Sequence, residues 1–203
     1  MKHKAKLLGI VGSHRKGGNS YELVKTVFQS LPVDYEIIEL ADSNIRFCDL
    51  CEQCKYKDCV LQDDFNQILK EMKEADGIIF SLPKYLFVSS KFLAFLERLN
   101  TVCHMREYSG YEHKPDRIDY RLFSEKPSCI FFTSGQGKPE NEIAKVVADY
   151  VESLGLTLMH NDRPPFVGVN IKTGDTKGEV LNNRQGIAEC TTMIAKMVDS
   201  MKK

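Results

Sequence analysis

The fold is decided by the stretch Lys6–Ser20, which reads KLLGIVGSHRKGGNS. Its first half, Lys6–Gly12, is a short apolar run that ends in glycine, which is typical of a fully buried β-strand. The second half leads into Asn19–Leu31, where apolar side chains recur with helical spacing. The chain therefore opens with a strand, a loop and a helix, which is the repeating unit of sheets covered by helices.

The same alternation continues to the end of the chain. Four further buried strands are predicted at Tyr35–Leu40, Gly77–Leu82, Ser128–Thr133 and Leu156–His160. Helices are predicted at Gln62–Ala75, from Ser89 or Ser90 to Leu99, at Pro139–Leu154 and at Asn183–Met201. Five strands that alternate with helices imply a doubly wound α/β fold, in which a parallel sheet is covered on both faces.

Residues 1–203 are expected to form a single domain, because this length suits one core and no linker or internal repeat divides the chain. Two segments interrupt the alternation of strands and helices. A cysteine-rich insert occupies about residues 43–61, after the second strand, and residues 101–126 have no clear period. The second insert is expected to be irregular. Its role is open between a subunit contact, a cover over a cofactor and an ordinary solvated loop.

The composition argues against several classes of partner. Lysine plus arginine equals aspartate plus glutamate at 28 each, so no net charge steers the protein to nucleic acid or to an anionic membrane. No run of about 18 apolar residues is present, so no transmembrane helix is expected. The apolar run behind the basic amino terminus, Leu7–Val11, is too short for a signal peptide. A cytoplasmic location is expected, without nucleic acid or membrane among the partners.

Four cysteines fall within twelve residues, with the spacing C-x2-C-x2-C-x4-C. In a reducing compartment, cysteines grouped in this way bind metal more often than they form disulfides. Thiolates are soft ligands, and iron–sulfur clusters are held by four of them, often with two residues between the first three. The predicted cluster ligands are Cys48, Cys51, Cys54 and Cys59.

Two alternatives remain for this cysteine motif, which are structural zinc and uncoordinated thiols. Four-cysteine zinc sites usually pair two knuckles across a longer gap, which favours the cluster. Acidic and basic residues balance within the segment, so its own charges leave the reduction potential of a cluster open. The motif follows the second strand, which predicts a position at the carboxyl edge of the sheet.

Ligands of doubly wound sheets bind beyond the carboxyl ends of the strands, and three loops are predicted to converge there. The loop after the first strand offers a helix N-terminus, amides and hydroxyls that can hold a phosphate, through Ser13, Arg15, Gly18, Asn19 and Ser20. The loop after the third strand offers aromatic rings and a cation, through Pro83, Lys84, Tyr85 and Phe87. The loop after the fourth strand offers closely approaching amides, through Thr133, Ser134, Gly135 and Gly137. Together these loops suit flavin mononucleotide (FMN).

Each of these loops also has a plainer interpretation. The glycine-rich loop has neither the Walker A nor the dinucleotide-binding pattern, and it can be an ordinary strand-to-helix turn. Tyr85 and Phe87 can pack in the core, as aromatic side chains often do. Lys84 can lie beside a reduced flavin, where its charge would stabilise an anionic ring, or in solvent.

The chain resembles the flavodoxin-like NADPH-dependent FMN reductase superfamily, and within it the iron–sulfur flavoprotein branch. Residues 12–20 match its Gly-Ser-x-Arg-x-x-Gly-Asn-Ser phosphate loop, and Cys48–Cys59 matches its compact cysteine motif. The resemblance implies a five-stranded sheet of order 2-1-3-4-5, FMN, a 4Fe-4S cluster and a homo-oligomer, a dimer or tetramer, in which a neighbouring subunit helps to form the flavin site. Residues 81–87 are bulkier than the Gly-Ser-Pro-x-Tyr motif usual in the family, which implies a more crowded ring pocket.

These features lead to the hypothesis of an iron–sulfur flavoprotein. Electrons would pass from a one-electron donor such as ferredoxin through the cluster to FMN, and on to a small-molecule acceptor. Such chemistry requires no side-chain acid, base or nucleophile. One alternative is a reductase without a cluster that uses NAD(P)H to reduce FMN or a quinone. Another is a flavodoxin-like binding module that senses redox state through its cysteines.

Overall fold

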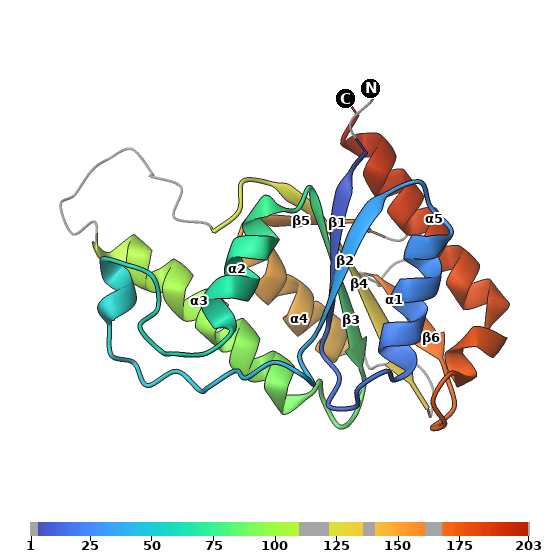
Figure 1. The fold of residues 1–203 in the computed structure, drawn as a ribbon, viewed down its shortest axis with the longest axis horizontal. Coiled ribbons are helices and arrows are strands. Elements are labelled where there is room, and N and C mark those ends of the chain that lie inside the picture. Colours follow the sequence, from blue (N-terminus) through green and yellow to red (C-terminus); the bar gives the residue numbers. More distant parts are fainter. Residues whose placement is uncertain (1–3, 110–121, 136–140, 161–167, 203) are drawn as a thin grey trace.

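The computed structural model of the chain describes residues 4–109, 122–135, 141–160 and 168–202. Within these ranges the sheet has six parallel strands, which are β1 (Lys6–Val11), β2 (Asp34–Glu39), β3 (Gly77–Pro83), β4 (Lys126–Ser134), β5 (Leu156–Leu158) and β6 (Val169–Lys172). Five of them lie in the order β2-β1-β3-β4-β5, and β6 pairs with β4. The expected α/β fold and its strand order are therefore confirmed (Figure 1).

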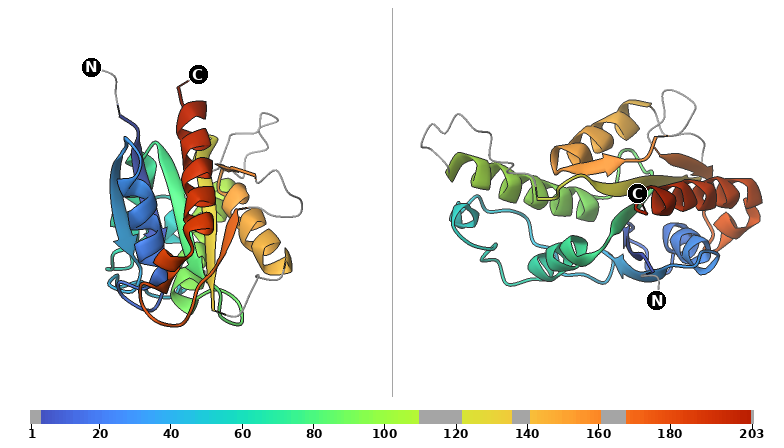
Figure 2. Two further views of the ribbon diagram at one scale, coloured as in Figure 1. Left: turned by 90° about the vertical axis from the view of Figure 1, so that its right-hand side faces the viewer. Right: turned by 90° about the horizontal axis from the view of Figure 1, so that it is seen from above.

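Helices cover both faces of this sheet (Figures 1 and 2). One face carries α1 (Asn19–Gln29) and α5 (Arg184–Ser200), and the other carries α2 (Phe65–Glu74), α3 (Ser90–Ser109) and α4 (Asn141–Ser153). Side chains alternate along β1, so Leu7 joins the core beneath α1 and α5, whereas Leu8 and Ile10 join the core on the opposite face. Because both of their faces are buried, the inner strands β1, β3 and β4 have nearly continuous apolar sequences, whereas the edge strand β2 is more polar. No helix in the described ranges has the length and apolar character needed to cross a membrane.

The sixth strand, β6, is missing from the sequence-based expectation, which placed a loop in this part of the chain. β5 pairs with the first three residues of β4, and β6 pairs with Phe131–Ser134 at its other end. The last position of the sheet is thus shared by two short strands. Gly168 allows the chain to approach β4 here, because its φ is +93° and a Cβ atom would lie 2.1 Å from the carbonyl oxygen of Ile130.

The expected irregular insert at residues 101–126 is wrong in its first part. Helix α3 continues to Ser109, well past the predicted end near Leu99. Phe95, Leu99 and Val102 are all buried, and their spacing keeps the same side of the helix against the core. The polar residues that follow Val102 in the sequence obscured this period. Residues 110–121 lie outside the described part of the chain, and residues 122–125 lead into β4.

Candidate functional site

The loop between β1 and α1 is built around the amino-terminal end of the helix. Gly18 precedes α1, and no described side chain caps this helix end. The first N–H groups of a helix have no partner within it, and the positive end of its dipole favours anions. Ser13 Oγ accepts a hydrogen bond from the amide of Arg15 at 3.0 Å, and the Glu39 carboxylate accepts one from the amide of Gly17 at 2.8 Å. The protein itself therefore holds the loop in a shape that can receive a phosphate.

The loops after β1, β3 and β4 converge on one cavity of about 110 Å³ at the carboxyl edge of the sheet. Predicted site residues that line it are Ser13, Arg15, Gly18, Asn19, Ser20, Pro83, Lys84, Tyr85, Thr133 and Gly135. Ser134 stands between Thr133 and Gly135 in the sequence, but its side chain is buried and does not line this cavity. Its carbonyl accepts a hydrogen bond from the amide of Thr173 at 2.8 Å. The predicted residue Gly137 lies outside the described residues.

Buried hydroxyl groups fix the relative positions of these loops. Ser20 Oγ and Thr133 Oγ1 share a hydrogen bond of 2.7 Å between α1 and β4. Ser81 Oγ donates to the carbonyl of Ser20 at 2.9 Å, which joins β3 to the same helix. All three side chains are buried, so breaking either bond would leave an unpaired polar group away from water. The cavity is thus preorganised by polar contacts that link two strands and a helix.

A fourth segment, Thr173–Asp175, completes the cavity, and the sequence did not reveal it. Asn19 Nδ2 donates to the carbonyl of Gly174 at 3.0 Å, and an Arg15 guanidinium nitrogen donates to the carbonyl of Asp175 at 2.6 Å. The Asp175 carboxylate lies over Gly135, where a Cβ atom would be only 2.6 Å from Oδ1. The segment follows β6, so it could not be placed without that strand. Its only sequence signal is the glycine-rich turn at residues 174–178.

The two aromatic residues predicted for the ring site separate in the structure. Tyr85 lines the cavity and is 51% exposed, and its ring stacks on His14 with the ring centres 6.1 Å apart. His14 also shares a hydrogen bond of 3.2 Å with Ser90 Oγ at the start of α3. The amide of Tyr85 donates to the carbonyl of Phe87, which closes a tight turn, and Phe87 lines a different cavity. The sequence assigned no role to His14, which here supports Tyr85.

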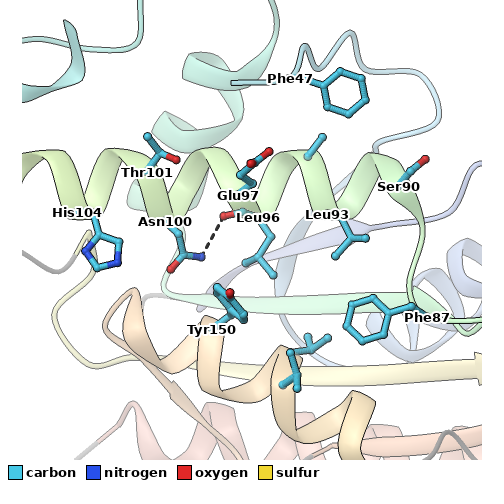
Figure 3. Close-up of a pocket in the computed structure, with 13 residues that line it drawn as sticks. Phe47, Phe87, Ser90, Leu93, Leu96, Glu97, Asn100, Thr101, His104 and Tyr150 are labelled. Carbon is cyan, nitrogen blue, oxygen red and sulfur yellow. Dashed lines mark hydrogen bonds between the residues drawn. The ribbon is translucent and has the colours of Figure 1, made fainter. Parts of the chain in front are cut away.

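The second cavity is a groove of about 740 Å³ between α3 and α4. Figure 3 shows Phe87 and Ser90 at one end of it, and Thr101 and His104 at the other. Its lining is mainly apolar and includes Leu93, Leu96 and Tyr150. The groove therefore follows α3 from the neighbourhood of Tyr85 towards the cysteine segment, which also contacts Thr101.

The cysteine segment leaves the carboxyl end of β2 and runs beside α3 before it reaches α2 (Figure 1). Cys48, Cys51, Cys54 and Cys59 all line one small cavity, whose other wall includes Arg98 and Val102 of α3. The turn between the cysteines requires left-handed backbone at Leu50 and Glu52, with φ of 52° and 59°. Its Asp49 carboxylate accepts a hydrogen bond from the amide of Cys51 at 3.2 Å.

The four thiols are close enough to influence one another. The pKa of the Cys54 thiol is raised, mainly by burial and further by Cys59, Cys48 and Cys51. Among the residues that the structure describes, no three cysteine, histidine or carboxylate side chains are arranged to hold a single metal ion. In a 4Fe-4S cluster each cysteine binds a different iron, so the ligand set needs a shared cavity rather than one common point. The four thiolates suit such a cluster chemically, but the cavity between them is only about 10 Å³, so the thiols would have to move apart to hold it.

The cysteine cavity and the cavity of the phosphate loop have no lining residue in common. Ser90 at the start of α3 contacts His14, which stacks on Tyr85, whereas Arg98 and Val102 line the cysteine cavity farther along the helix. From Ser90 to Arg98 the helix rises by roughly 12 Å, at about 1.5 Å per residue. The sequence predicted that the cysteines join the three loops at the carboxyl edge of the sheet. In the structure they lie farther along α3 instead.

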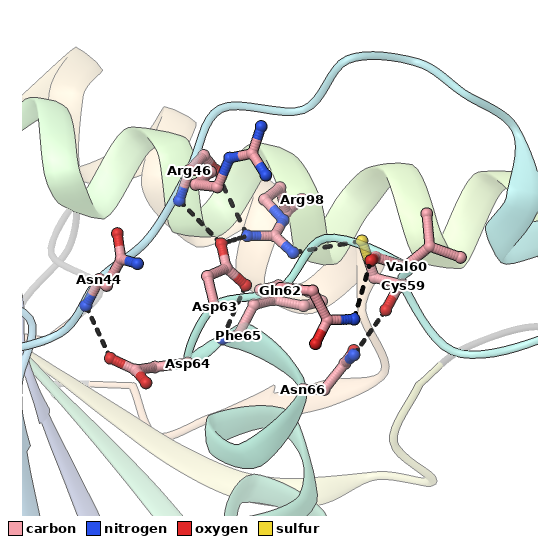
Figure 4. Close-up of polar contacts among 10 residues, drawn as sticks. All are labelled: Asn44, Arg46, Cys59, Val60, Gln62, Asp63, Asp64, Phe65, Asn66 and Arg98. Atoms are coloured by element: carbon pink, nitrogen blue, oxygen red, sulfur yellow. Dashed lines mark hydrogen bonds and ion pairs between the residues drawn. The ribbon is translucent and has the colours of Figure 1, made fainter.

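A buried arginine borders the cysteine cavity (Figure 4). Arg98 is 1% exposed and donates to the Asp63 carboxylate, to the carbonyl of Arg46 at 3.3 Å and to the sulfur of Cys59 at 3.2 Å. Its guanidinium carbon lies 4.1 Å from the centre of the Phe65 ring. The sequence contained a signal for this position, because Arg98 has helical spacing from the apolar Phe95 and Val102 and so falls on the inward side of α3.

Asp63 neutralises this arginine from the amino-terminal end of α2. Its carboxylate also accepts hydrogen bonds from the amides of Arg46 at 2.8 Å and Phe65 at 3.2 Å. Burial by itself would raise the pKa of Asp63, but the bonds from Arg98 and the two amides outweigh it and hold that pKa below its ordinary value of 3.8. Burial by itself would lower the pKa of Arg98. The contacts with Asp63 and Cys59 outweigh this effect and raise that pKa. Both groups are therefore charged at neutral pH.

Comparison with known sequences gives a consistent set of relatives. A model of the NADPH-dependent FMN reductase family matches residues 5–159. An iron–sulfur flavoprotein from Methanocaldococcus jannaschii is 27% identical over 203 residues, which cover 97% of this chain and 97% of that protein. An iron–sulfur flavoprotein from Methanosarcina thermophila is 32% identical over 85 residues, which cover 40% of this chain and 44% of that protein.

Solved structures of flavoproteins share the fold. RosB with a bound flavin intermediate, 8-demethyl-8-formylriboflavin-5'-phosphate, aligns with a TM-score of 0.66 at 14% identity, over 98% of this chain and 80% of RosB. An NAD(P)H:quinone oxidoreductase from Methanothermobacter marburgensis aligns with a TM-score of 0.59 at 14% identity, over 94% of this chain and 97% of that enzyme. At such identities the likeness concerns the fold alone.

Proposed function

Since the chain belongs to the NADPH-dependent FMN reductase family, we propose that it acts in electron transfer as an iron–sulfur flavoprotein. It is a flavin-dependent oxidoreductase, in keeping with its family and with the oxidoreductases that share its fold. The proposed donor is a ferredoxin-like one-electron carrier, and the proposed acceptor is a small molecule. The observation that carries the proposal is that all four cysteines of the compact motif line one cavity in the folded chain.

The cavity at the carboxyl edge is the proposed FMN site. Arg15 and the amino-terminal end of α1 would hold the phosphate, because both favour a dianion. Buried Ser13 and Ser20 offer hydroxyl groups on the same side. Tyr85 would flank the ring, and Lys84 would place a cation near it. FMN bound there supplies the ability to take up electrons singly and to release them in pairs.

The proposed cluster ligands are Cys48, Cys51, Cys54 and Cys59. All seven cysteines of the chain are free thiols, which agrees with the proposed reducing, cytoplasmic setting. The left-handed turns at Leu50 and Glu52 reverse the chain between ligands, so a short segment can surround a compact inorganic core. A 4Fe-4S cluster held there supplies one-electron chemistry.

A homo-oligomer is proposed as the working form. Leu86 is 96% exposed and Tyr85 is half exposed at the edge of the proposed flavin site. An apolar side chain so exposed beside a cofactor site is suited to burial against a second subunit. The mainly apolar groove between α3 and α4 adjoins this edge at Phe87.

The cluster is tested by composition. Protein purified without oxygen and reconstituted with iron and sulfide should contain FMN together with about four iron and four acid-labile sulfide per chain. The Cys51→Ser variant should lose sulfide and iron but keep FMN, because Cys51 lines only the cysteine cavity. Cys103→Ser is the matched control, since Cys103 lies on α3 outside the motif and should leave both cofactors in place. Reconstituted wild-type protein without acid-labile sulfide would contradict the proposal.

A second candidate function is an NAD(P)H-dependent reductase of FMN or quinone without a cluster. The family description favours it, as do solved oxidoreductases of the same fold. This function predicts that Cys51→Ser reduces its flavin with NADPH as fast as the wild type. A redox-sensing binding module would instead show no turnover with any donor.

A further inference from the structure

Arg98 carries a charge in the core, beside the proposed cluster ligands. A guanidinium that is 1% exposed has lost nearly all contact with water, which is costly unless its charge and its N–H groups are satisfied. Asp63 supplies the opposite charge, and its side chain is fully buried. The pair joins the middle of α3 to the start of α2 (Figure 4).

The donors of Arg98 exceed what this ion pair needs. One terminal nitrogen is bound to Asp63 and to the carbonyl of Arg46. The other terminal nitrogen lies 3.2 Å from the sulfur of Cys59. The remaining donor, Nε, is buried and has no hydrogen-bond partner among the described residues. Buried donors without a partner are rare, and this one belongs to a residue that lines the cysteine cavity.

We propose that Arg98 is the residue that positions Cys59 and raises the reduction potential of the cluster. This inference rests on the proposed function, because it needs the cysteines to hold a cluster. Reduction adds one electron, and with it one negative charge, to the cluster and its sulfur ligands. A cation and an N–H donor beside a ligand sulfur stabilise the more negative state, and such hydrogen bonds are among the factors that set cluster potentials.

Asp63 does not cancel this effect, because of how the pair is oriented. The guanidinium nitrogen contacts the sulfur, whereas the carboxylate binds on the other terminal nitrogen and at two backbone amides. The positive end of the pair therefore faces the ligand. Acidic and basic residues balance within the cysteine segment itself. The cation beside the ligand sulfur is Arg98, which lies on α3, 39 residues after Cys59 in the chain.

The structure offers a matched control on the same helix. Lys91 Nζ donates to the carbonyls of Leu40, Ala41 and Ser43 at 2.9–3.1 Å, which hold the start of the cysteine segment. Lys91 thus also pins this segment to α3 with a cation, but it contacts no cysteine sulfur in the described structure. A variant at Lys91 should loosen the segment without changing the electrostatics of the ligands.

The test is a redox titration of the cluster, followed by EPR, in wild type and in three variants. In Arg98→Met combined with Asp63→Asn, no buried charge is left unpaired, and the midpoint potential should fall. A tenfold loss in the relative stability of the reduced cluster would appear as a fall of about 59 mV for one electron. Arg98→Lys keeps the charge but loses the planar guanidinium group. Its midpoint potential should therefore lie between those of the wild type and the double variant. Lys91→Met should keep the wild-type potential.

Cluster loss to a chelator gives a second readout. It should be several-fold faster in both Arg98 variants than in Lys91→Met, because Cys59 loses a contact that positions it. If the double variant does not fold, Arg98→Lys decides the question. Wild-type potential and wild-type cluster retention in a folded Arg98 variant would overturn this inference and leave the proposed function standing. A wild-type protein that takes up no cluster would overturn both.

Discussion

Asp63 is a buried carboxylate whose lowered pKa links the stability of the fold to pH. Its carboxylate is fully buried, and its pKa is held below 3.8 by Arg98 and two backbone amides. A carboxylate with a lowered pKa in the folded state contributes stability that is fully present above its unfolded pKa. That contribution is lost as the pH falls through the lowered folded pKa. The Asp63–Arg98 pair therefore contributes to the loss of stability in acid.

We predict that the apoprotein loses free energy of unfolding as the pH falls below about 4, the ordinary pKa range of an aspartate. Asp63→Asn should cost about 3–5 kcal/mol at neutral pH, since it leaves Arg98 buried without a counterion. Its stability should also depend less on pH in the acid range. Urea unfolding between pH 3 and pH 7 measures both effects. Parallel stability curves for variant and wild type would show that Asp63 is not the group responsible.

Single residues also mark the limit of prediction from sequence. The residues between Ser13 and Ser20 that line one cavity could be grouped from the sequence, because they stand close together in a single loop. Arg98 was not predicted, because its partners Asp63 and Cys59 are 35 and 39 residues away in the chain. Phe87 was grouped with Tyr85, but a turn of two residues sends it into the groove between α3 and α4.

At the scale of elements, the phosphate loop depends on a segment that follows the last strand. Asn19 bridges the two, since Nδ2 donates to the carbonyl of Gly174 and Oδ1 accepts from the amide of Val180 at 3.3 Å. Both bonds cross from α1 to residues 174–180. The first turn of α1 is therefore held partly by a turn and a short 3-10 helix more than 150 residues later in the chain.

We predict that Asn19→Ala weakens FMN binding by roughly 5- to 150-fold, because two hydrogen bonds worth about 1–3 kcal/mol together no longer hold residues 174–180 against the loop. Fluorescence titration of the apoprotein with FMN measures the affinity. Hydrogen exchange should accelerate at residues 174–180 and remain unchanged in β1. Asn100→Ala is the control, because Asn100 Nδ2 donates to the carbonyl of Leu96 on α3, away from this cavity. Equal losses in both variants would argue against the bridge.

Elements were predictable where their signal is periodic and long. β1, β3 and β4 are continuous apolar runs, and they fix the parallel sheet. β6 alternates apolar and polar residues, but it has only four residues, so the alternation is too short to stand out in the sequence. Its place is set instead by Gly168, whose contact with β4 is a tertiary feature. The sequence analysis ended α3 too early because the last part of the helix is mostly polar, although Val102 on it is buried.

At the scale of the whole molecule, one long helix connects two separate sites. Ser90 at the start of α3 contacts His14 beside the proposed flavin cavity, and Arg98 lines the cysteine cavity. The sequence placed both sites on one edge of the sheet, because it showed only that the cysteines follow β2. Their final position depends on how residues 40–64 pack along α3, and no local pattern encodes that path.

We predict that the two cofactors bind independently, since their cavities have no residue in common. Adding FMN at 100 times its dissociation constant should stabilise the apoprotein by about 2.7 kcal/mol, and the same gain should appear in Cys51→Ser. Thermal unfolding with and without FMN measures this. A smaller gain in the cysteine variant would indicate that the cysteine segment contributes to the flavin site.

In the proposed function, one-electron equivalents enter at the cysteines and reach the flavin. Rapid mixing of anaerobic holoprotein with a reduced ferredoxin-type donor tests it most directly, with flavin absorbance as the readout. We predict fast flavin reduction in the wild type and in Cys103→Ser, and loss of this reaction in Cys51→Ser with FMN still bound. Equal rates of flavin reduction in Cys51→Ser and in the wild type would contradict it.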